Sequence, residues 1–215
     1  MTVQAKTDPQ ELVARYFLLQ AERPEGLEEV EIGKLEPFLR SLLFTDGTVT
    51  RALSVQMLAP VSVRPLSQEE VAVPDELAGY LGADGGDASI RRRVEIGAGS
   101  TTFLWAESHL LPARLPEDFF GELDDSPDGI GQSVQQAAIE NYRELLWFGF
   151  EAAPEWAKPV AGGATMRRLY RLVSGRQAAI LISESFSVEW RSGAYRLAGF
   201  DSAAAGRPPL VGGVR

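Results

Sequence analysis

The sequence of 215 residues contains no cysteine and only one histidine, His109. Without cysteine the chain has no disulfide bond, no thiolate nucleophile and no zinc knuckle. A single histidine excludes a metal site built from several histidines, and it weakens any proposal of a Ser-His triad. The composition therefore excludes metal sites built from cysteine or from several histidines.

The chain also lacks an excess of positive charge and any long apolar run. Its net charge is −9 and its pI is about 4.8, so its surface as a whole should not attract nucleic acid or an anionic membrane. No run reaches transmembrane length, and residues 1–12 lack the apolar core of a signal peptide. We expect a cytoplasmic protein in which any anionic ligand needs a local basic pocket.

The order of elements predicts an α+β fold, with an antiparallel sheet and helices outside it and over one end. Asp8, Pro9 and Glu11 form the start signal of a helix, since they supply a cap, a first-turn proline and a capping-box acid. Further helices are expected over 34–43 and 130–139. Strands are expected over 49–63 (one or two, broken near Pro60), 90–96, 102–111, 142–150, 167–186 and 190–200, the last two including hairpins where Gly follows Ser.

The segment 167–186 contains the first candidate site residue, Glu184. In a strand Ile180, Ile182, Glu184 and Phe186 share one face, so Glu184 points wherever these apolar side chains point. A buried carboxylate needs a cation or hydrogen-bond donors, or it stays protonated, and this makes Glu184 a candidate acid or base. The alternative is an exposed face near the sheet edge, with Glu184 in solvent.

The segment 91–96 contains the second candidate. In a strand Arg92, Val94 and Ile96 face one way, and the apolar character of this face predicts that Arg92 lies inside. A buried guanidinium presents a planar fork of donors that suits a carboxylate, from either Glu184 or a ligand. The alternative is a row of surface arginines on an edge strand.

The segment 103–110 alternates in the same way. Ala106 and Ser108 fall on one face, and such small side chains would leave room for a ligand. His109 falls on the other face, where it is expected to be a packing or surface residue. Arg143 lies between Glu140 and Glu144, and this spacing indicates a surface salt bridge if the segment is helical.

Taken together, these segments resemble the chorismate pyruvate-lyase family. The resemblance rests on five motifs in order: LLFTDGTVTR (42–51), RRVEI (92–96), LWAESHLLPARLP (104–116), GIGQSVQQAAIENYRELL (129–146) and RRLYRLVSGRQAAILISESF (167–186). The motif at 129–146 looks like the larger bacterial branch of the family. The resemblance covers about two-thirds of the chain, and its motifs are specific as a set.

The resemblance implies a six-stranded antiparallel sheet whose ligand lies inside, under helical flaps. We expect one domain over 1–200, with a helical extension over 1–33 and a flexible tail over 201–215, and the N-terminal helix and the residues after Phe186 lie outside the match. The carboxylate-binding arginine of the family maps onto Arg92, or onto Arg93 in an ungapped match. The catalytic glutamate maps onto Glu184, and apolar pocket positions map onto Val49 and Ile130.

The activity implied is the elimination of pyruvate from chorismate to give 4-hydroxybenzoate, without a metal ion or cofactor. Arg92 and Glu184 would be the catalytic pair, with the pKa of Glu184 raised by its apolar face. Ser108 and Val49 would line the substrate site with Ile130. A second cation for the other carboxylate of chorismate is expected at Arg168 or Arg171.

Two alternatives to the lyase hypothesis remain open. Ser185 and Ser187 stand where larger side chains are usual, and a wider pocket for a larger anionic metabolite would follow, with a cyclase or isomerase activity. The third hypothesis is not enzymatic, because the same fold occurs as the effector-sensing domain of transcription regulators. Residues 1–33 are too short and too acidic for the DNA-binding domain that precedes such a domain.

Overall fold

The structure, a computed structural model, describes residues 8–125, 129–157 and 164–200. The expected tail over 201–215 lies outside these residues. The described part forms a seven-stranded antiparallel sheet of order β1-β2-β3-β6-β5-β4, in which β7 pairs with one end of β6. The strands are β1 (Ser62–Ala72), β2 (Ala88–Ala98), β3 (Thr101–Leu110), β4 (Tyr142–Glu151), β5 (Ala164–Ser174), β6 (Gln177–Arg191) and β7 (Ala194–Leu197).

Helices cover the sheet, which confirms the α+β fold. The α-helices are α1 (Pro9–Ala14), α2 (Pro37–Phe44), α3 (Val49–Met57), α4 (Asp75–Leu81), α5 (Phe119–Asp125) and α6 (Ile130–Gln136). Three short 3-10 helices are η1 (Gln20–Glu22), η2 (Ile32–Lys34) and η3 (Pro112–Arg114). No helix of the described part is long and apolar enough to cross a membrane.

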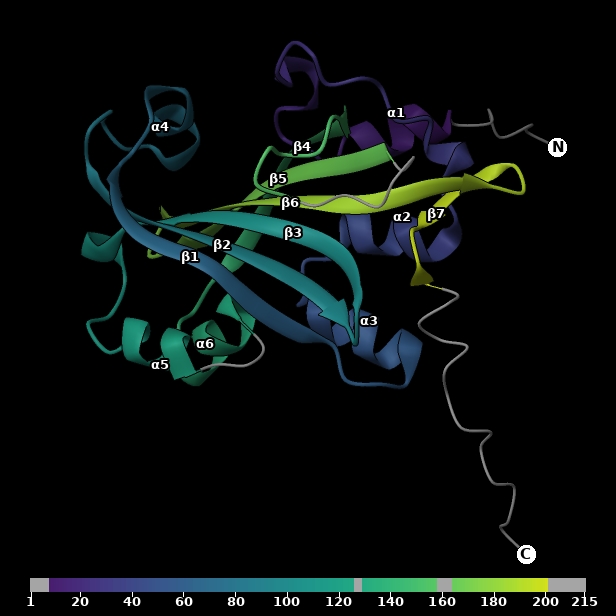
Figure 1. The fold of residues 1–215 in the computed structure, drawn as a ribbon. Helices are drawn as coiled ribbons and strands as arrows, with labels where there is room; N and C mark the ends of the chain where they lie inside the picture. The colour runs from purple at the N-terminus through teal and green to yellow at the C-terminus, as the bar shows by residue number, and fades with distance from the viewer. Residues whose placement is uncertain (1–7, 126–128, 158–163, 201–215) are drawn as a thin grey trace, which may run out of the picture.

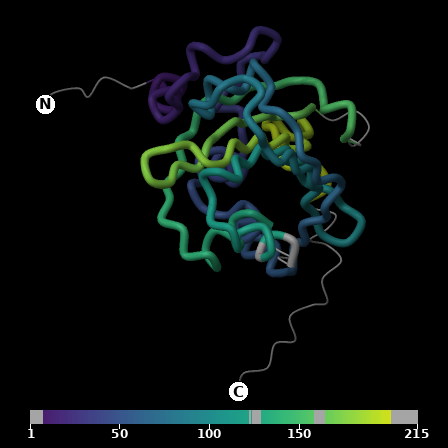
Figure 2. Tube along the Cα trace, turned by 90° about the vertical axis from the view of Figure 1, so that its left-hand side faces the viewer, coloured from purple at the N-terminus to yellow at the C-terminus, as the bar shows by residue number. Residues whose placement is uncertain are grey.

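Figure 1 shows α2, α3, α5 and α6 below the sheet and α4 above it. In Figure 2 the blue α2–α3 segment and the teal α5–α6 segment again lie next to each other on one side of the strands. Buried apolar side chains from these helices and from the facing strands form two core clusters, and a third cluster lies on the opposite face of the sheet. Both faces of the sheet are therefore covered.

Several local signals behave as predicted. Asp8 caps α1, since its carboxylate accepts a hydrogen bond from the backbone N–H of Gln10 at 2.9 Å. The turn between β5 and β6 has Gly175 and Arg176 at φ 54° and 68°, a pair of left-handed residues that matches the right-handed twist of a hairpin. The hairpin expected around residues 192–193 also forms, between β6 and β7.

The expectation of strands over 49–63 is wrong for its first half. Residues Val49–Met57 form α3, and the strand β1 begins only at Ser62. Val49, Leu53 and Met57 are all buried, so the segment has the four-residue spacing of an amphipathic helix. This apolar stripe outweighs the β preference of the branched residues at its start.

Candidate functional site

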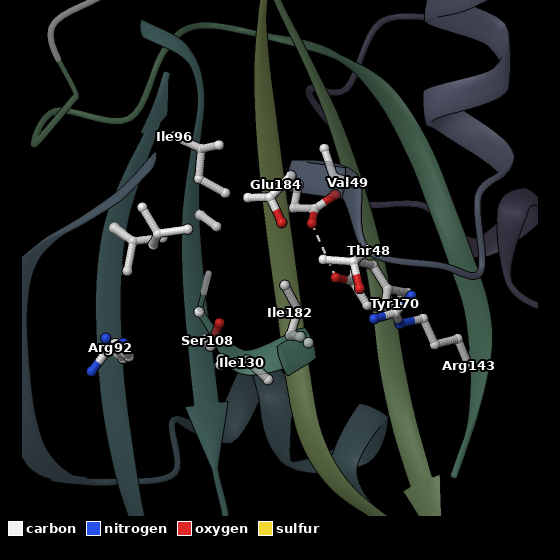
Figure 3. A pocket seen from close by; sticks show the side chains of 16 residues that line it. Thr48, Val49, Arg92, Ile96, Ser108, Ile130, Arg143, Tyr170, Ile182 and Glu184 are labelled. Atoms are coloured by element: carbon white, nitrogen blue, oxygen red, sulfur yellow. Dashed lines mark hydrogen bonds between the residues drawn. The ribbon is translucent and has the colours of Figure 1, made fainter. Parts of the chain in front are cut away.

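The pocket lies between one face of the sheet and the first turns of α3 and α6 (Figure 3). It encloses about 530 Å³ of empty space, part of which is open to solvent. Its lining residues are Thr48, Val49, Thr50, Val63, Arg92, Val94, Ile96, Ala106, Ser108, Gly129, Ile130, Gly131, Arg143, Tyr170, Ile182 and Glu184.

Strand register places the polar residues of the pocket in two adjacent rows across the sheet. One row runs through the register pairs of Arg92 with Ser108, Ser108 with Ile182, and Ile182 with Tyr170. The next row pairs Ala106 with Glu184. Opposite residues of antiparallel strands point to the same face, so these side chains converge, and the small side chains at 106 and 108 leave the space between them.

Glu184 is the buried acid of the site, with 5% of its surface exposed. The Arg168 guanidinium holds one carboxylate oxygen, since its Nε donates to Oε2 at 2.7 Å and its Nη2 lies 2.7 Å from the same atom. The Tyr170 hydroxyl donates to the other oxygen, Oε1, at 3.0 Å. The cation that compensates the buried charge is therefore Arg168 rather than Arg92.

Arg168 also ties this acid to the turn that follows α2. Its side chain is fully buried, and Nη1 donates to the backbone carbonyls of Leu42, Leu43 and Thr45 at 2.7, 2.9 and 3.1 Å. These bonds use the orphan carbonyls at the end of a helix. Arg168 thus lies beneath the pocket as the partner of Glu184, which corrects its expected role as a second cation for the ligand.

Tyr170 remains a hydrogen-bond donor over the whole physiological pH range. Burial raises the pKa of its hydroxyl group far above the ordinary value, and the neighbouring Glu184 carboxylate raises it further. The guanidinium of Arg168 lies 4.9 Å from the centre of its ring. Tyr170 is therefore a neutral donor that fixes the orientation of the acid.

Arg92 lies inside the pocket, as the strand-face argument predicts. Its residue surface is only 4% exposed, and its Nη1 donates to the side-chain oxygen of Gln68 on β1 at 2.5 Å. Arg93 points to the opposite face of the sheet, where its Nε donates to Glu107 at 2.6 Å and its guanidinium lies over the ring of Trp156. The register therefore brings Arg92, and not Arg93, to the pocket.

Arg171 does not reach the pocket either. It lies on the opposite face, where its Nε donates to Glu144 at 2.6 Å and its Nη1 donates to the carbonyl of Tyr80 at 2.6 Å. Ser185 and Ser187 alternate with Glu184 and so also face away from the pocket. These serines cannot widen it, so the expectation of a wider pocket loses its basis.

Val49 and Ile130 line the pocket from the helical side, in the positions that the resemblance implied. They stand at the first residues of α3 and α6, and these two helices touch where Gly131 meets Thr48. A Cβ atom on Gly131 would lie 2.8 Å from the Thr48 hydroxyl oxygen, so only glycine permits this approach. The two helix starts together form the roof over the sheet.

Arg143 and Tyr170 are pocket residues that sequence reasoning missed. Arg143 was expected on the surface. It lies on strand β4 rather than on a helix, and it lines the pocket instead of pairing with Glu140 or Glu144 on the surface. Its Nη1 donates to the carbonyls of Asp46 and Gly47, in the turn before α3. The strand-like run that begins at Tyr142 was the signal that could have revealed its direction.

The opposite face of the sheet has a separate polar cluster around Glu107. Burial alone would raise the pKa of Glu107, but hydrogen bonding to His109 and Arg93 and their charges outweigh burial and lower it to about 2. His109 is itself buried, with its Nε2 3.7 Å from Glu107 and its Nδ1 3.4 Å from the Ser89 hydroxyl. Within the described residues, no group of three or more His, Cys, Asp or Glu side chains is placed to hold a metal ion.

Solved structures similar to this chain show the same fold. The effector domain of PhnF from Mycobacterium smegmatis matches with a TM-score of 0.50 and 15% identity, over 67% of this chain and 90% of that chain. The structure of PhnF from the same organism matches with a TM-score of 0.53 and 15% identity, over 67% of this chain and 65% of that chain. At this identity the likeness concerns the fold alone.

Sequence comparison places the chain more narrowly. It is 29% identical over 171 residues to a chorismate pyruvate-lyase of Mycobacterium tuberculosis (strain H37Rv), with 74% of this chain and 84% of that protein covered. A chorismate pyruvate-lyase of Mycobacterium leprae is 28% identical over 167 residues, with 74% and 79% covered. The family model described as chorismate pyruvate-lyase Rv2949c-like matches residues 43–192, more than half of the chain. The chain therefore belongs to the Rv2949c-like chorismate pyruvate-lyase family.

Proposed function

We propose that this protein is a lyase that eliminates pyruvate from chorismate and releases 4-hydroxybenzoate, without a metal ion or cofactor. The observation that carries the proposal is the presence of one buried acid, Glu184, and one buried arginine, Arg92, in the lining of the same pocket. Membership of the family supports a lyase that acts on chorismate.

Chorismate is a dianion with an enolpyruvyl ether on a cyclohexadiene ring. In the elimination the bond between the ring carbon and the ether oxygen breaks, and the adjacent ring carbon, which bears the hydroxyl group, loses its hydrogen as a proton. The ring becomes aromatic and the enolpyruvate leaves, takes up one proton and becomes pyruvate. The reaction is therefore downhill once the protein supplies a route for this proton.

Glu184 is the group that would move the proton. Its carboxylate faces the pocket, and its two oxygens are fixed by Arg168 and Tyr170, so it is held in one orientation. Such a group can take the ring proton and return it to the leaving oxygen, which is general acid–base catalysis by a single residue. Orientation of the acid before the substrate binds lowers the cost of reaching the transition state.

Arg92 would anchor a carboxylate of the substrate and stabilise negative charge during the reaction. A guanidinium with little exposure to water interacts strongly with an anion, because the surrounding medium is apolar. Val94, Ile96 and Ile182 supply that apolar lining. Ser108 and Ala106 leave space for the ring between Arg92 and Glu184.

The test is the consumption of chorismate by purified protein and by two matched variants. Glu184→Gln removes the acid, whereas Glu144→Gln makes the same chemical change at a glutamate outside the pocket. We expect Glu184→Gln to lower kcat by at least about 100-fold and Glu144→Gln to leave it nearly unchanged. Circular dichroism and thermal denaturation confirm that both variants are folded. Full turnover by Glu184→Gln would reject the mechanism.

A second candidate function is ligand binding without chemistry, which the fold of the PhnF effector domain favours. A binding pocket needs a complementary charge, but it does not need a fixed acid at its centre. Saturable binding of chorismate with no product formed would select this candidate. The cyclase or isomerase hypothesis has no remaining support, since Ser185 and Ser187, the residues that suggested it, face away from the pocket.

A further inference from the structure

Two arginines reach the pocket from strands that lie far apart in the sheet. Arg92 comes from β2 and Arg143 comes from β4, and three strands lie between them. Four inter-strand spacings separate their backbones by about 19 Å along the sheet. Figure 3 shows the two side chains on opposite sides of Ile182, with Glu184 above it. The pocket therefore has a guanidinium at each end.

Arg143 differs from most arginines of the sheet because its charge has no carboxylate partner among the described residues. Seven other arginines on strands lie against a glutamate: Arg64 with Glu95, Arg91 with Glu69, Arg93 with Glu107, Arg167 with Glu151, Arg168 with Glu184, Arg171 with Glu144 and Arg196 with Glu36. The polar contacts of Arg143 are the two carbonyls of Asp46 and Gly47. Its Nε is buried and makes no hydrogen bond within the described part of the chain.

The adjacent charges do not compensate Arg143. Glu184 is neutralised by Arg168, which holds it at 2.7 Å. The neighbouring acid Glu144 points to the other face of the sheet, where it accepts a hydrogen bond from Arg171. A partly buried guanidinium without a counter-charge is costly unless a ligand supplies one. Arg143 thus provides an unused anion-binding group at the edge of the pocket.

We infer that Arg143 binds the second carboxylate of the substrate, the one on the enolpyruvyl ether, while Arg92 binds the carboxylate of the ring. The inference rests on the proposed function and extends it, because it makes the pocket a receptor for dianions. Arg92 lies at the deeply buried end, with 4% exposure. Arg143 also borders a second hollow on the outside of the protein, beside Tyr16 and Leu18. The enolpyruvyl carboxylate, which leaves as part of pyruvate, thus lies at the end of the pocket that is nearer to solvent.

The hydrogen bonds of Arg143 also explain how its position is fixed. Nη1 holds the turn of Asp46 and Gly47, which leads directly into the pocket residues Thr48 and Val49. The ring of Tyr170 lies beneath the guanidinium, with 5.5 Å between the ring centre and Cζ. One nitrogen is thus engaged by the protein, whereas Nε has no partner in the described structure and offers a donor for a carboxylate.

The experiment uses two inert ligands of similar size that differ in one charge. The dianion is 3-(carboxymethoxy)benzoate, whose two carboxylates are placed as on the chorismate skeleton, and the monoanion is 3-propoxybenzoate. Calorimetry measures the Kd of each for the wild type, for Arg143→Gln and for Arg51→Gln. Arg51 is a matched control because it is an exposed arginine of α3 that bonds Gln135 outside the pocket.

We expect the wild type to prefer the dianion. Arg143→Gln should weaken dianion binding by roughly 10- to 100-fold, the usual effect of losing a charge-assisted hydrogen bond, and monoanion binding by less than about 3-fold. Arg51→Gln should change neither Kd by more than about 2-fold. An equal loss of affinity for both ligands in Arg143→Gln would mean that Arg143 only holds the turn, and this result would overturn the inference. No preference of the wild type for the dianion would also overturn it.

A second measurement needs no variant, and so it remains decisive if Arg143→Gln does not fold. Phenylglyoxal modifies accessible arginines, and mass spectrometry of the wild type shows which arginine has reacted. We expect the dianion to protect Arg143 and the monoanion to leave it reactive. Equal protection by both ligands would contradict the inference. Binding is read without turnover, so a protein that forms no product from chorismate can still confirm or refute this site, and failure of the two proposals is distinguishable.

Discussion

Replacing Tyr170 by phenylalanine tests whether the acid of the pocket is held as the structure indicates. The variant removes only the hydroxyl group that donates to Glu184 at 3.0 Å. The ring remains, and it still packs in the core beside Leu172 and Ile182. Arg168 still holds the other carboxylate oxygen at 2.7 Å. The change therefore isolates one hydrogen bond to a buried charge.

The expected cost is about 1.5–3 kcal/mol in the free energy of unfolding, the range for a hydrogen bond to a charged group. In a protein of this length that loss corresponds to a fall in Tm of about 3–12 °C. Urea denaturation of the wild type and of Tyr170→Phe measures it directly. Tyr80→Phe is the matched control, because the Tyr80 hydroxyl makes no hydrogen bond within the described residues, and a change below about 0.5 kcal/mol is expected there. A similarly small change for Tyr170→Phe would refute the account of how Glu184 is fixed.

Two further predictions concern the other face of the sheet and the middle of the pocket. The folded state lowers the pKa of Glu107 from 4.5 to about 2, so its stabilisation is present above pH 4.5 and is lost as the pH falls toward 2. Glu107→Gln should lower the free energy of unfolding by up to about 3 kcal/mol at pH 7 and by almost nothing near pH 2. Urea titrations of both proteins over this pH range measure the difference, and a difference that does not change with pH would contradict the assignment. Ser108→Leu should fill the space between the pocket rows, weaken chorismate binding more than about 10-fold in calorimetry, and change the free energy of unfolding by less than about 2 kcal/mol. Unchanged binding would show that the ligand lies elsewhere.

The strand-face pattern was enough to predict which side chains of the sheet point inward. Alternation placed Arg92, Ser108 and Glu184 on apolar faces, and the structure brings all three to one pocket. It also separated Arg92 from its neighbour Arg93, which a motif match alone could not do. This succeeds because the period of two is strict within an unbroken strand.

The partner of Glu184 could not be predicted, because a β-bulge decides it. If the pairing of β5 with β6 continued without a shift from Ser174 and Gln177 at the hairpin turn, Arg167 would lie opposite Glu184. The register shifts between Leu172 and Val173, and Arg168 takes that place instead. Such a one-residue insertion has no clear signal in the sequence, and it reverses which arginine of a pair faces the pocket.

The roof of the pocket was the least predictable part. The resemblance predicted Val49 as a pocket residue and Val49 lines the pocket, but the segment that carries it was expected to be a strand and is the helix α3. Arg143 was missed because its neighbours Glu140 and Glu144 suggested a helical surface pair. In both cases the local pattern fitted the period of a helix as well as that of a strand, and tertiary packing selected between the two.

The most direct test of the central claim is to follow both products from chorismate in a single reaction with the wild-type protein. Pyruvate is measured by its reduction with lactate dehydrogenase, and 4-hydroxybenzoate is measured by chromatography. The account predicts release of the two products in equal amounts, at a rate proportional to protein concentration and well above that of chorismate alone. Release at the uncatalysed rate, or one product without the other, would contradict it.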